Sequence, residues 1–523
     1  MTDAERTTAA IDPAPDADMA TLARGGRLNV FGFALRLAAR LPFLFIAGRI
    51  YGAASLGRFA YAVLVVEFGA QLASLGLRRG LAQLLANAKK PQSCIVADAL
   101  MVAAIGSALV MAILFVFPKA MYPTTAIHGM DRMLAITVLA ISWTDIALAA
   151  LAYHHDVGAT VRARSIVEPW TISIVAFGWS YVSLEDGLIV SYVFSMVAAL
   201  VAALIPLVKC YGIPRDWKPD LGTAWGTARR NVPVAAADAV EWASRRVDLA
   251  VLGAFMPAAF VGIYYVAQQV ATLPAKLKTS FEPVLGPAIA KRIAAGDRAA
   301  VAQQVRQVTY WIVAAQVGIA LALAIPGRGV MGLVGSGFTG GTATLGFLLA
   351  AEVIAAAAVV SEAALIYVAR AQNMVISLVM LALEAGLAAV LIIVMRNQGL
   401  PQSWQATGPA IALCIALAFA SITKSLLLCR KLGEPVSGWR WDIAWAAAAG
   451  IAVGVPIRLW TPEWAQLIIG IPAILGAFGA VLWTKGFGPE DRELFRMGKE
   501  DVAELREAEA ASEARDQVED DVV

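Results

Sequence analysis

Charged side chains are scarce in this sequence. Asp, Glu, Lys and Arg make up 15% of its 523 residues, whereas hydrophobic residues make up 59%. Ordinary soluble domains carry about 25% charged residues, so this composition excludes a water-soluble fold for most of the chain. The net charge of +3 is small, and it gives no reason to expect nucleic acid as a partner.

Paired cysteines and the signatures of nucleotide and metal enzymes are also missing. The four cysteines are Cys94, Cys210, Cys414 and Cys429. They show no CxxC spacing and sit in or beside apolar segments, so we interpret them as small buried hydrophobes without a disulfide framework. The chain has no GxxxxGK(S/T) loop, no HExxH motif and no His and Cys pair at metal-ligand spacing. We therefore expect no cofactor, no metal centre and no catalytic residue.

The two ends of the chain differ from everything between them. Residues 1–27 are acidic and rich in Pro and Ala, and they lack the basic start and short apolar core of a secretory signal. Residues 486–523 hold 13 Asp or Glu against 5 Lys or Arg, with a helix-prone stretch that would be solvated on all faces. We interpret both ends as cytoplasmic tails, the first of them disordered.

Long apolar segments recur between the tails. A helix needs about 20 mostly apolar residues to cross a bilayer, and backbone groups in lipid must be paired internally, which leaves helices or closed barrels. The alternation of barrel strands is absent. The expected spans are 28–50, 56–76, 95–117, 132–152, 165–183, 187–208, 231–255, 258–281, 307–327, 341–367, 375–396, 406–428, 441–459 and 464–484. The sequence thus predicts an all-α polytopic membrane protein with about 14 transmembrane helices.

Basic residues are distributed unevenly over the predicted loops. Lys and Arg collect in the cytoplasmic loops of membrane proteins. The even-numbered loops contain 19 of them, whereas the odd-numbered loops contain two, Lys119 and Arg328. This bias predicts that both termini face the cytoplasm. No odd-numbered loop is long enough for an outer domain, so any chemistry must happen within the bundle.

The sequence repeats itself at an offset of 205 residues, where 40–62 aligns with 245–267. The seven identical pairs are Arg40 and Arg245, Leu44 and Leu249, Gly48 and Gly253, Ala53 and Ala258, Ala54 and Ala259, Gly57 and Gly262, and Ala62 and Ala267. Six spans separate the copies, so both run in the same direction across the membrane. Parallel repeats predict two pseudo-symmetric six-helix lobes with a substrate site between them, and they favour a transporter.

Ionisable residues inside the predicted spans are candidates for function. Each costs about 2.5–3.5 kcal/mol on insertion scales, so such residues normally face a cavity or a partner. The first span carries Arg36 and Arg40, which are four apart and share a helix face, and the second carries Glu67 alone. The eighth span adds Lys276, whose alternative is to reach the cytoplasmic surface.

The seventh predicted span carries the longest charged stripe. Its members, at spacings of 3, 4 and 3 residues, are Asp238, Glu241, Arg245 and Asp248. On one continuous helix they share a face, and Arg246 projects about 100° away. A stripe of alternating sign this long cannot face lipid. We expect it to face a water-filled cavity, with a complementary polar helix as the alternative.

These residues together predict a cationic cavity between the lobes. Its candidate substrate-binding residues are Arg36, Arg40, Arg245, Arg246 and Lys276. Guanidinium groups bind phosphate oxygens in a planar fork, so the cavity suits a substrate that bears phosphate. The candidate charge-balancing residues are Glu67, Asp238, Glu241 and Asp248. One of them could instead bind and release a coupling cation, Na⁺ or H⁺.

Three segments resemble a known family of exporters. They are 51–83, which begins YGAASLGRFAYA, 245–274, which begins RRVDLAVLGAF, and 281–301, which begins FEPVLGP. The first resembles the Gly-bracketed turn after span one of the polysaccharide transporter branch of the multidrug, oligosaccharidyl-lipid and polysaccharide exporter superfamily. The second resembles that branch's R-x-D-x-x-x-x-G segment, here Arg246, Asp248 and Gly253. The patterns are diffuse, and they bear on fold and class more than on substrate.

The resemblance implies a bacterial inner-membrane flippase that moves undecaprenyl diphosphate-linked oligosaccharide by alternating access. The implied partners are that lipid-linked oligosaccharide, membrane lipids and other polysaccharide-assembly proteins, for surface polysaccharide or lipopolysaccharide biosynthesis. The expected parts are an N-terminal tail (1–27), an N-lobe (28–208), a linker (209–230), a C-lobe (231–428), two further spans (429–485) and a C-terminal tail (486–523).

Two functions other than a flippase are also considered for this sequence. A cation-coupled antiporter of drugs or small molecules would share the fold but should line its cavity with carboxylates rather than arginines. A membrane-embedded polysaccharide polymerase would need a sizeable outer loop or an exposed acid pair for sugar chemistry, and the sequence offers neither. The arginine pairs therefore favour the flippase.

Overall fold

The computed structural model describes residues 41–486, except 88–89, 155, 215–216, 273, 275–288, 290–292 and 294–296. Within these residues the regular structure is entirely helical, with no strand, which confirms the predicted all-α class. Three predicted site residues, Arg36, Arg40 and Lys276, lie outside the described residues, as do both predicted tails except Gly486.

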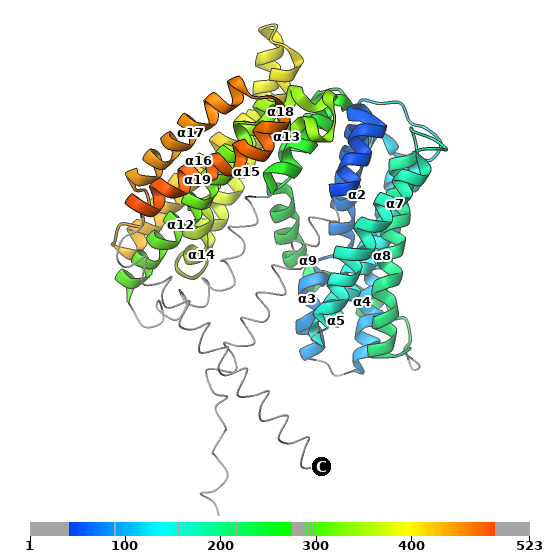
Figure 1. Ribbon diagram of the computed structural model, residues 1–523. Helices are drawn as coiled ribbons and strands as arrows, with labels where there is room; N and C mark the ends of the chain where they lie inside the picture. Colours follow the sequence, from blue (N-terminus) through cyan, green and yellow to red (C-terminus); the bar gives the residue numbers. More distant parts are fainter. Residues whose placement is uncertain are drawn as a thin grey trace, which may run out of the picture.

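The first half of the chain forms one group of helices. After a helical start at 41–46 and a π-helical segment Ala47–Tyr51, its helices are α2 (Gly52–Ala73), α3 (Leu77–Ala86), α4 (Gln92–Val116), α5 (Thr137–Tyr153), α6 (Val157–Thr160), α7 (Glu168–Trp179) and α8 (Gly187–Tyr211). A second π-helical segment, Val161–Val167, joins α6 to α7. Figure 1 shows α2, α3, α4, α5, α7 and α8 close together, and we call them the first group.

The second half of the chain contains both long and short helices. These elements are α9 (Leu221–Ser244), α10 (Val247–Phe255), a helix at 258–272, α12 (Arg298–Ala324), α13 (Gly327–Val334), α14 (Thr342–Val368), α15 (Arg370–Asn397), α16 (Gln402–Leu432), α17 (Trp441–Trp460), α18 (Glu463–Ala465) and α19 (Ile471–Val481). Helices α12 to α19 form the second group in Figure 1. The predicted linker 209–230 is mostly helical, because α8 continues to Tyr211 and α9 begins at Leu221.

Ten helical stretches in the described residues are long and apolar enough to cross a membrane, which makes this a multi-pass membrane protein. The difference from the fourteen predicted spans has particular causes. The first two predicted spans join into one helical stretch, Leu41–Ala86. The helical stretch that contains the fifth carries Arg162 and Arg164 just before the predicted start and Glu168 just after it. The seventh is broken, and the eighth runs out of the described residues. The number fourteen stays a prediction.

The two groups approach each other through small residues of the internal repeat. Ala53 and Gly57 of α2 pack directly on Ala258 and Gly262, their repeat equivalents. A Cβ atom on Gly57 would collide with the carbonyl oxygen of Ala258, and one on Gly262 with that of Ala53. Small residues at this spacing let two membrane helices touch along their backbones. We call this pseudo-symmetric packing the small-residue contact.

A side chain of the first half strengthens the same end of the molecule. The guanidinium of Arg49 donates to the carbonyl oxygen of Leu333 in α13 at 2.9 and 3.2 Å. Figure 1 shows the groups close together at the end where α2 and α13 lie, and diverging toward the end where α3 and α14 lie. The structure therefore joins the two halves mainly at one end.

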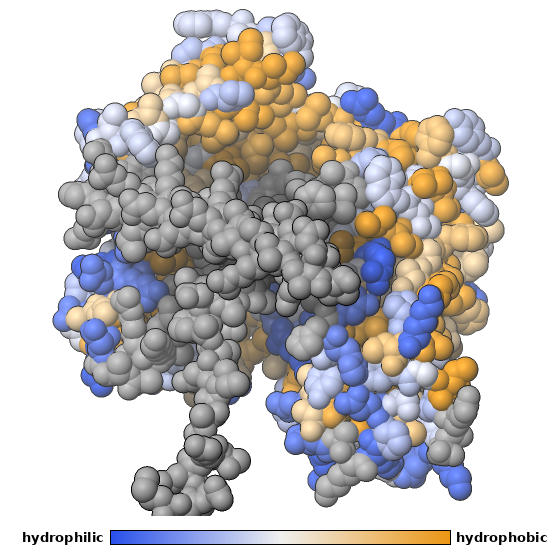
Figure 2. Space-filling view, turned by 60° about the horizontal axis from the view of Figure 1, so that its bottom comes forward, coloured by the Kyte–Doolittle hydropathy of each residue, from blue (hydrophilic) through white to orange (hydrophobic). Residues whose placement is uncertain are grey.

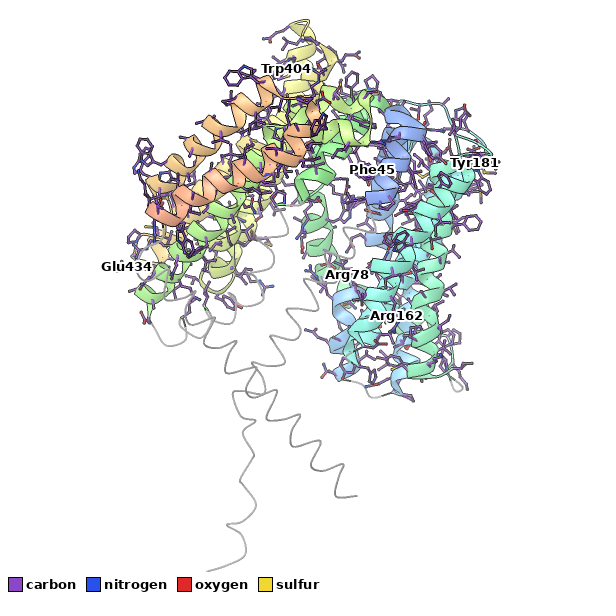
Figure 3. All side chains as sticks on the ribbon, viewed as in Figure 1. Phe45, Arg78, Arg162, Tyr181, Trp404 and Glu434 are labelled. Carbon is purple, nitrogen blue, oxygen red and sulfur yellow. The ribbon has the colours of Figure 1, made fainter. Side chains whose placement is uncertain are left out.

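The loops that differ in charge lie at opposite ends of the helices. Figure 3 shows Arg162 and Glu434, which belong to even-numbered predicted loops, at one end, and Tyr181 and Trp404 at the other. Figure 2 shows hydrophilic residues gathered at the lower ends of the helices and apolar residues over much of their flanks. This is the arrangement of a helical bundle with apolar flanks in lipid and charged loops in water.

Candidate functional site

Charged side chains gather where the α9–α10 junction passes α2 and α3. Helix α9 ends at Ser244, the N–H groups of Arg245 and Arg246 donate three residues back to Trp242 and Ala243 at 3.2 and 3.0 Å, and α10 begins at Val247. The prediction of one continuous charged stripe is therefore wrong. The turn rotates α10 relative to α9, so Asp248 does not share a face with the acids of α9.

The break also divides the packing of this segment between the two groups. Helix α9 packs against α2, α3 and α4 of the first group, whereas α10 packs mainly against α15 and α16 of the second. No proline or glycine marks the junction in the sequence. The chain changes partners at Arg245–Arg246, and charged contacts on both sides of the turn accompany the change.

On the α9 side, one arginine of the first group binds two acids. The guanidinium of Arg79 lies 3.1 Å from the carboxylate of Asp238 and 2.6 Å from that of Glu241. Glu241 also pairs with Arg245 at 3.1 Å. The side chains of Arg79 and Arg245 remain 50% and 66% exposed, so both keep donors free for a further anion.

At the turn itself, Arg246 crosses to the first group. Its guanidinium lies 2.8 Å from the carboxylate of Glu67 in α2, and its charged carbon sits 5.3 Å from the ring centre of Trp242. The Trp242 ring packs on Phe68 with ring centres 5.1 Å apart. Arg79 thus pairs with Asp238 and Glu241 of α9, and Glu67 pairs with Arg246 of the turn. We call these ion pairs together the ion-pair contact.

On the α10 side, Asp248 is buried in a polar pocket of its own. It accepts hydrogen bonds from the Tyr264 hydroxyl and the Leu249 N–H, both at 2.7 Å, and from the Gln268 amide at 3.2 Å. Helix α15 places Glu384 close enough for the Asp248 charge to act on it. Glu384 is 1% exposed, and its Oε2 has no hydrogen-bond partner among the described residues.

Two other intramembrane acids belong to local pairs. Asp145 pairs with Arg164, which also binds Glu168 at 2.9 Å. Glu362 of α14 lies 2.8 Å from the ammonium of Lys424 in α16. These pairs hold neighbouring helices of one group together. Asp248 and Glu384 are buried acids that form no ion pair within 4 Å among the described residues.

The structure thus brings some of the predicted site residues together and separates others. Glu67 and Arg246 meet, and so do Glu241 and Arg245, whereas Asp248 lies apart from both pairs. Sequence reasoning missed Arg79, because the segment LRRGLAQLLA was interpreted as a loop and is helix α3. Leucines at 77, 81, 84 and 85 carry the helical period that would have identified it.

The possible chemistry of this cluster follows from the exposure of its arginines and from their ability to exchange one anionic partner for another. Three accessible arginines, Arg79, Arg245 and Arg246, come from both halves of the chain, and each is held by a carboxylate. A phosphate or diphosphate offers them the same bidentate acceptors. An anionic ligand can therefore replace the acids and loosen α9 from the first group.

Comparisons with known proteins agree with this architecture. A family model described as "Polysaccharide biosynthesis protein" matches residues 37–292. The lipid II flippase MurJ in an inward closed conformation matches with a TM-score of 0.65 at 11% identity, over 87% of this chain and 99% of that chain. No curated protein matches the chain by sequence.

An inward-facing multidrug resistance MATE family transporter of the MOP superfamily matches with a TM-score of 0.58 at 14% identity. This match covers 76% of this chain and 98% of that chain. The predicted resemblance is confirmed, and the chain has the fold that these transporters share.

Proposed function

We propose that the protein flips a lipid-diphosphate-linked oligosaccharide across the bacterial inner membrane by alternating access, for surface polysaccharide or lipopolysaccharide biosynthesis. The observation that carries the proposal is the meeting of exposed arginines from both halves at the α9–α10 junction. Two comparisons support this substrate class. They are the match to a polysaccharide biosynthesis family model and the structural match to a lipid II flippase.

Alternating access needs contacts that hold one end closed and others that can be exchanged. The small-residue contact closes the end where α2 and α13 lie. The diphosphate of the substrate would compete with Asp238, Glu241 and Glu67 for the arginines and so release α9 from the first group. Release of α9 lets the two groups rock against each other, and this motion opens the small-residue contact in the outward-facing state.

A flipping assay tests the proposal. Proteoliposomes that contain a lipid-linked oligosaccharide in the inner leaflet are mixed with a lectin. The lectin binds the oligosaccharide only after it has reached the outer leaflet. We expect Arg79→Lys and Arg245→Ala to lower the rate at least about tenfold, in line with the loss of a charge-assisted contact. The matched control is Lys119→Ala, an exposed residue of an odd-numbered predicted loop. Wild-type rates in the arginine variants, or no flipping by the wild type, would refute the proposal.

We propose further that Asp248 and Glu384 carry the coupling cation. Both carboxylates are buried, and α10 packs on α15 so that the charge of Asp248 acts on Glu384. Two such acids repel unless a cation lies between them or one is protonated, so the pair suits an ion that binds and leaves. Asp248→Asn and Glu384→Gln should make flipping insensitive to an imposed Na⁺ or H⁺ gradient, and the effective gradient identifies the ion. Glu463→Gln, an exposed acid paired with Arg328, should keep the wild-type response. A full response in both buried variants would contradict this assignment.

The antiporter alternative has one specific observation in its favour, the MATE transporter with the same fold. Acids of the junction, Asp238 and Glu241, could face a cationic drug if the arginines turned away. Resistance profiling of a deletion strain separates the two functions. Drug sensitivity without an envelope defect would favour the antiporter, whereas loss of surface polysaccharide without drug sensitivity supports the flippase.

A further inference from the structure

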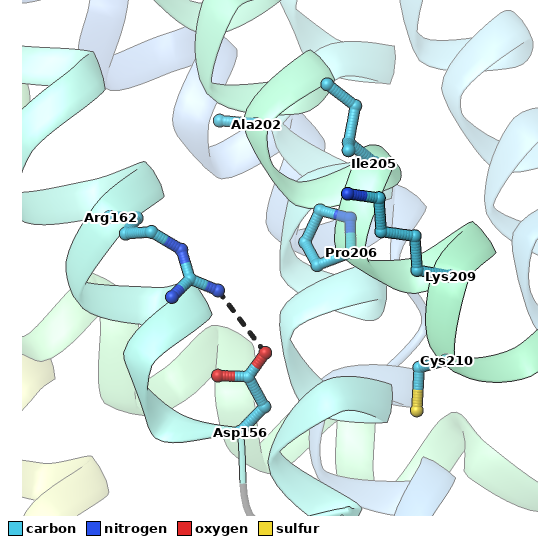
Figure 4. Close-up of a pocket in the computed structure, with 7 residues that line it drawn as sticks. All are labelled: Asp156, Arg162, Ala202, Ile205, Pro206, Lys209 and Cys210. Carbon is cyan, nitrogen blue, oxygen red and sulfur yellow. Dashed lines mark hydrogen bonds and ion pairs between the residues drawn. The ribbon is translucent and has the colours of Figure 1, made fainter.

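Two surface grooves of the described residues occupy corresponding places in the two halves. The first, of about 550 Å³, lies between the start of the fifth predicted span and the end of α8, and Arg162, Pro206 and Lys209 line it (Figure 4). The second, of about 490 Å³, lies between the start of α15 and the end of α16, and Val375 and Arg430 line it. In the predicted two-lobe arrangement, spans five and six correspond in order to spans eleven and twelve, so the two grooves would occupy equivalent places.

Each groove has one basic residue near the start of one helix and another in the last turn of the next helix. In the first, Arg162 stands in the π-helical segment before α7 and Lys209 in the last turn of α8. In the second, Arg370 opens α15 beside the lining residue Ala371, and Arg430 stands in the last turn of α16. All four side chains are exposed. Only the first groove contains an acid, Asp156, which lies 3.3 Å from Arg162.

An apolar stripe leads from each groove toward the middle of the membrane. Along α8 it consists of Phe194, Val197, Val201 and Ile205. Along α16 it consists of Ile415, Phe419, Ile422 and Leu426. Residues three or four apart lie on one helix face, and all eight side chains are exposed. Each groove therefore joins a basic rim to an open apolar stripe about three helical turns long.

We propose that each groove binds one anionic phospholipid, with its phosphate on the basic pair and its acyl chains along the stripe. Basic pockets between transmembrane helices at the membrane surface are suited to anionic headgroups. The net positive charge of both rims disfavours the cationic headgroups of zwitterionic lipids. Both grooves face the same leaflet, because Arg162 and Glu434, which follows Arg430 closely, lie at the same end in Figure 3.

The occupant differs from the transported molecule. There are two equivalent grooves, one in each half, whereas a two-lobed transporter carries its substrate through a single site between the halves. Neither groove includes Arg79, Arg245 or Arg246. The proposal thus stands apart from the flippase function, and lipid binding is measured without any transport.

Native mass spectrometry of protein released from nanodiscs of phosphatidylglycerol and phosphatidylethanolamine in equal amounts counts the bound lipids. We expect two phosphatidylglycerol molecules on the wild type. Arg162→Gln with Lys209→Gln should remove one, and Arg370→Gln with Arg430→Gln the other. Each basic residue near a charged membrane surface contributes on the order of fivefold in affinity, so each double variant should bind its lipid about 25-fold more weakly.

The matched control is the double variant Lys119→Gln and Arg132→Gln, two exposed basic residues of the opposite end, which should retain both lipids. Asp156→Asn should strengthen lipid binding, an effect that an unfolded variant could not produce. The amide still caps the N–H of Ala159, which Asp156 accepts at 3.0 Å, but the competing charge is gone, so phosphatidylglycerol should bind several-fold more tightly. Equal retention of phosphatidylethanolamine, equal losses in the control, or weaker binding by Asp156→Asn would overturn the proposal.

Discussion

The two contacts between the halves are built on opposite principles. The small-residue contact joins backbone to backbone through Gly57 and Gly262, with no room for a side chain. The ion-pair contact joins half-exposed charged side chains, Arg79 to Glu241 and Arg246 to Glu67. Close backbone packing is all or nothing because van der Waals attraction falls steeply with distance. Exposed ion pairs exchange partners readily, because water and other ions replace them at little cost.

This difference teaches which contact can respond to a substrate. A phosphate-bearing ligand has nothing to offer the small-residue contact, since that contact presents only methyl groups and backbone. It can replace each carboxylate of the ion-pair contact with an oxyanion of equal or higher charge. We infer that substrate binding breaks the ion-pair contact, whereas the small-residue contact stabilises the closed conformation. Substitutions can therefore perturb one contact and leave the other intact.

The largest effect should follow from filling the small-residue contact. Gly57→Leu places a side chain where the Ala258 carbonyl oxygen lies, and overpacking of this kind destabilises by about 1–3 kcal/mol, here at the upper end because backbone must move on both sides. We expect flipping to stop and spin labels on α2 and α13 to move apart. Double electron–electron resonance measures that separation.

Gly178→Leu in α7 is the matched control, because no atom of the described residues lies within 4 Å of a Cβ at this helical glycine. It should keep the wild-type distance and flipping rate. Gly262→Leu, the repeat equivalent of Gly57, should reproduce the Gly57 effect. A normal label distance in both variants would show that the small-residue contact is not what closes this end.

The second prediction separates stability from transport in the ion-pair contact. Arg79→Ala removes the partner of Asp238, whose side chain is 1% exposed, and an unpaired buried charge costs about 1–3 kcal/mol or more. Adding Asp238→Asn should restore most of the lost melting temperature, because the amide carries no charge. Flipping should stay at least about tenfold below wild type in both variants, since the guanidinium is gone. Recovery of flipping together with stability would mean that Arg79 has only a structural role.

A smaller effect should come from exchanging the charges of the pair at the turn. Glu67→Arg and Arg246→Glu alone each place two like charges together. The double exchange restores an ion pair, and partly exposed pairs of this kind contribute on the order of 0.5–1 kcal/mol. Melting temperatures of the four proteins give the coupling. Additive effects of the two substitutions would show that the 2.8 Å contact does not stabilise the junction.

The composition and the repeat predicted much of this structure. Apolar segments about 20 residues long gave an all-α membrane fold, since no other hydrogen-bonded arrangement is available to such segments in lipid. The repeat pointed to Gly57 and Gly262 as equivalent residues. It did not predict that they touch, because identity between two copies reports shared geometry and carries no information about contact. The division into lobes at 28–208 and 231–428 stays a prediction.

The junction was harder to predict, for a physical reason. A helix break without proline or glycine depends on contacts made by its neighbours, here Glu67 with Arg246 and Tyr264 with Asp248. Such contacts join residues from different helices, and spacing within one helix says nothing about them. The influence of the Asp248 charge on Glu384 was hidden for the same reason, since the two residues come from distant segments of the chain.

The smallest predicted effect concerns the start of α9, which the ion-pair contact holds at its other end. Asp220 caps this helix and accepts hydrogen bonds from the Thr223 hydroxyl at 2.5 Å and from the N–H groups of Gly222 and Thr223 at 2.9 and 3.1 Å. These bonds, with the Thr223 hydroxyl first, lower the pKa of Asp220 below its ordinary value of 3.8. A carboxylate whose pKa is lowered by folding stabilises the fold above the unfolded value and loses that effect as the pH falls through the lower, folded value.

The cap should therefore be complete from neutral pH down to about pH 5 and fade only below the ordinary Asp value of about 3.9. Asp220→Ala should speed hydrogen exchange at Gly222 and Thr223 at neutral pH, whereas Asp220→Asn, which still accepts, should change it little. The flipping rate should be unaffected, because the first turn of α9 lies far along the chain from Arg79's partners at Asp238 and Glu241. A large loss of flipping in Asp220→Ala would show instead that α9 moves as a rigid body. Its two ends could then not be perturbed independently.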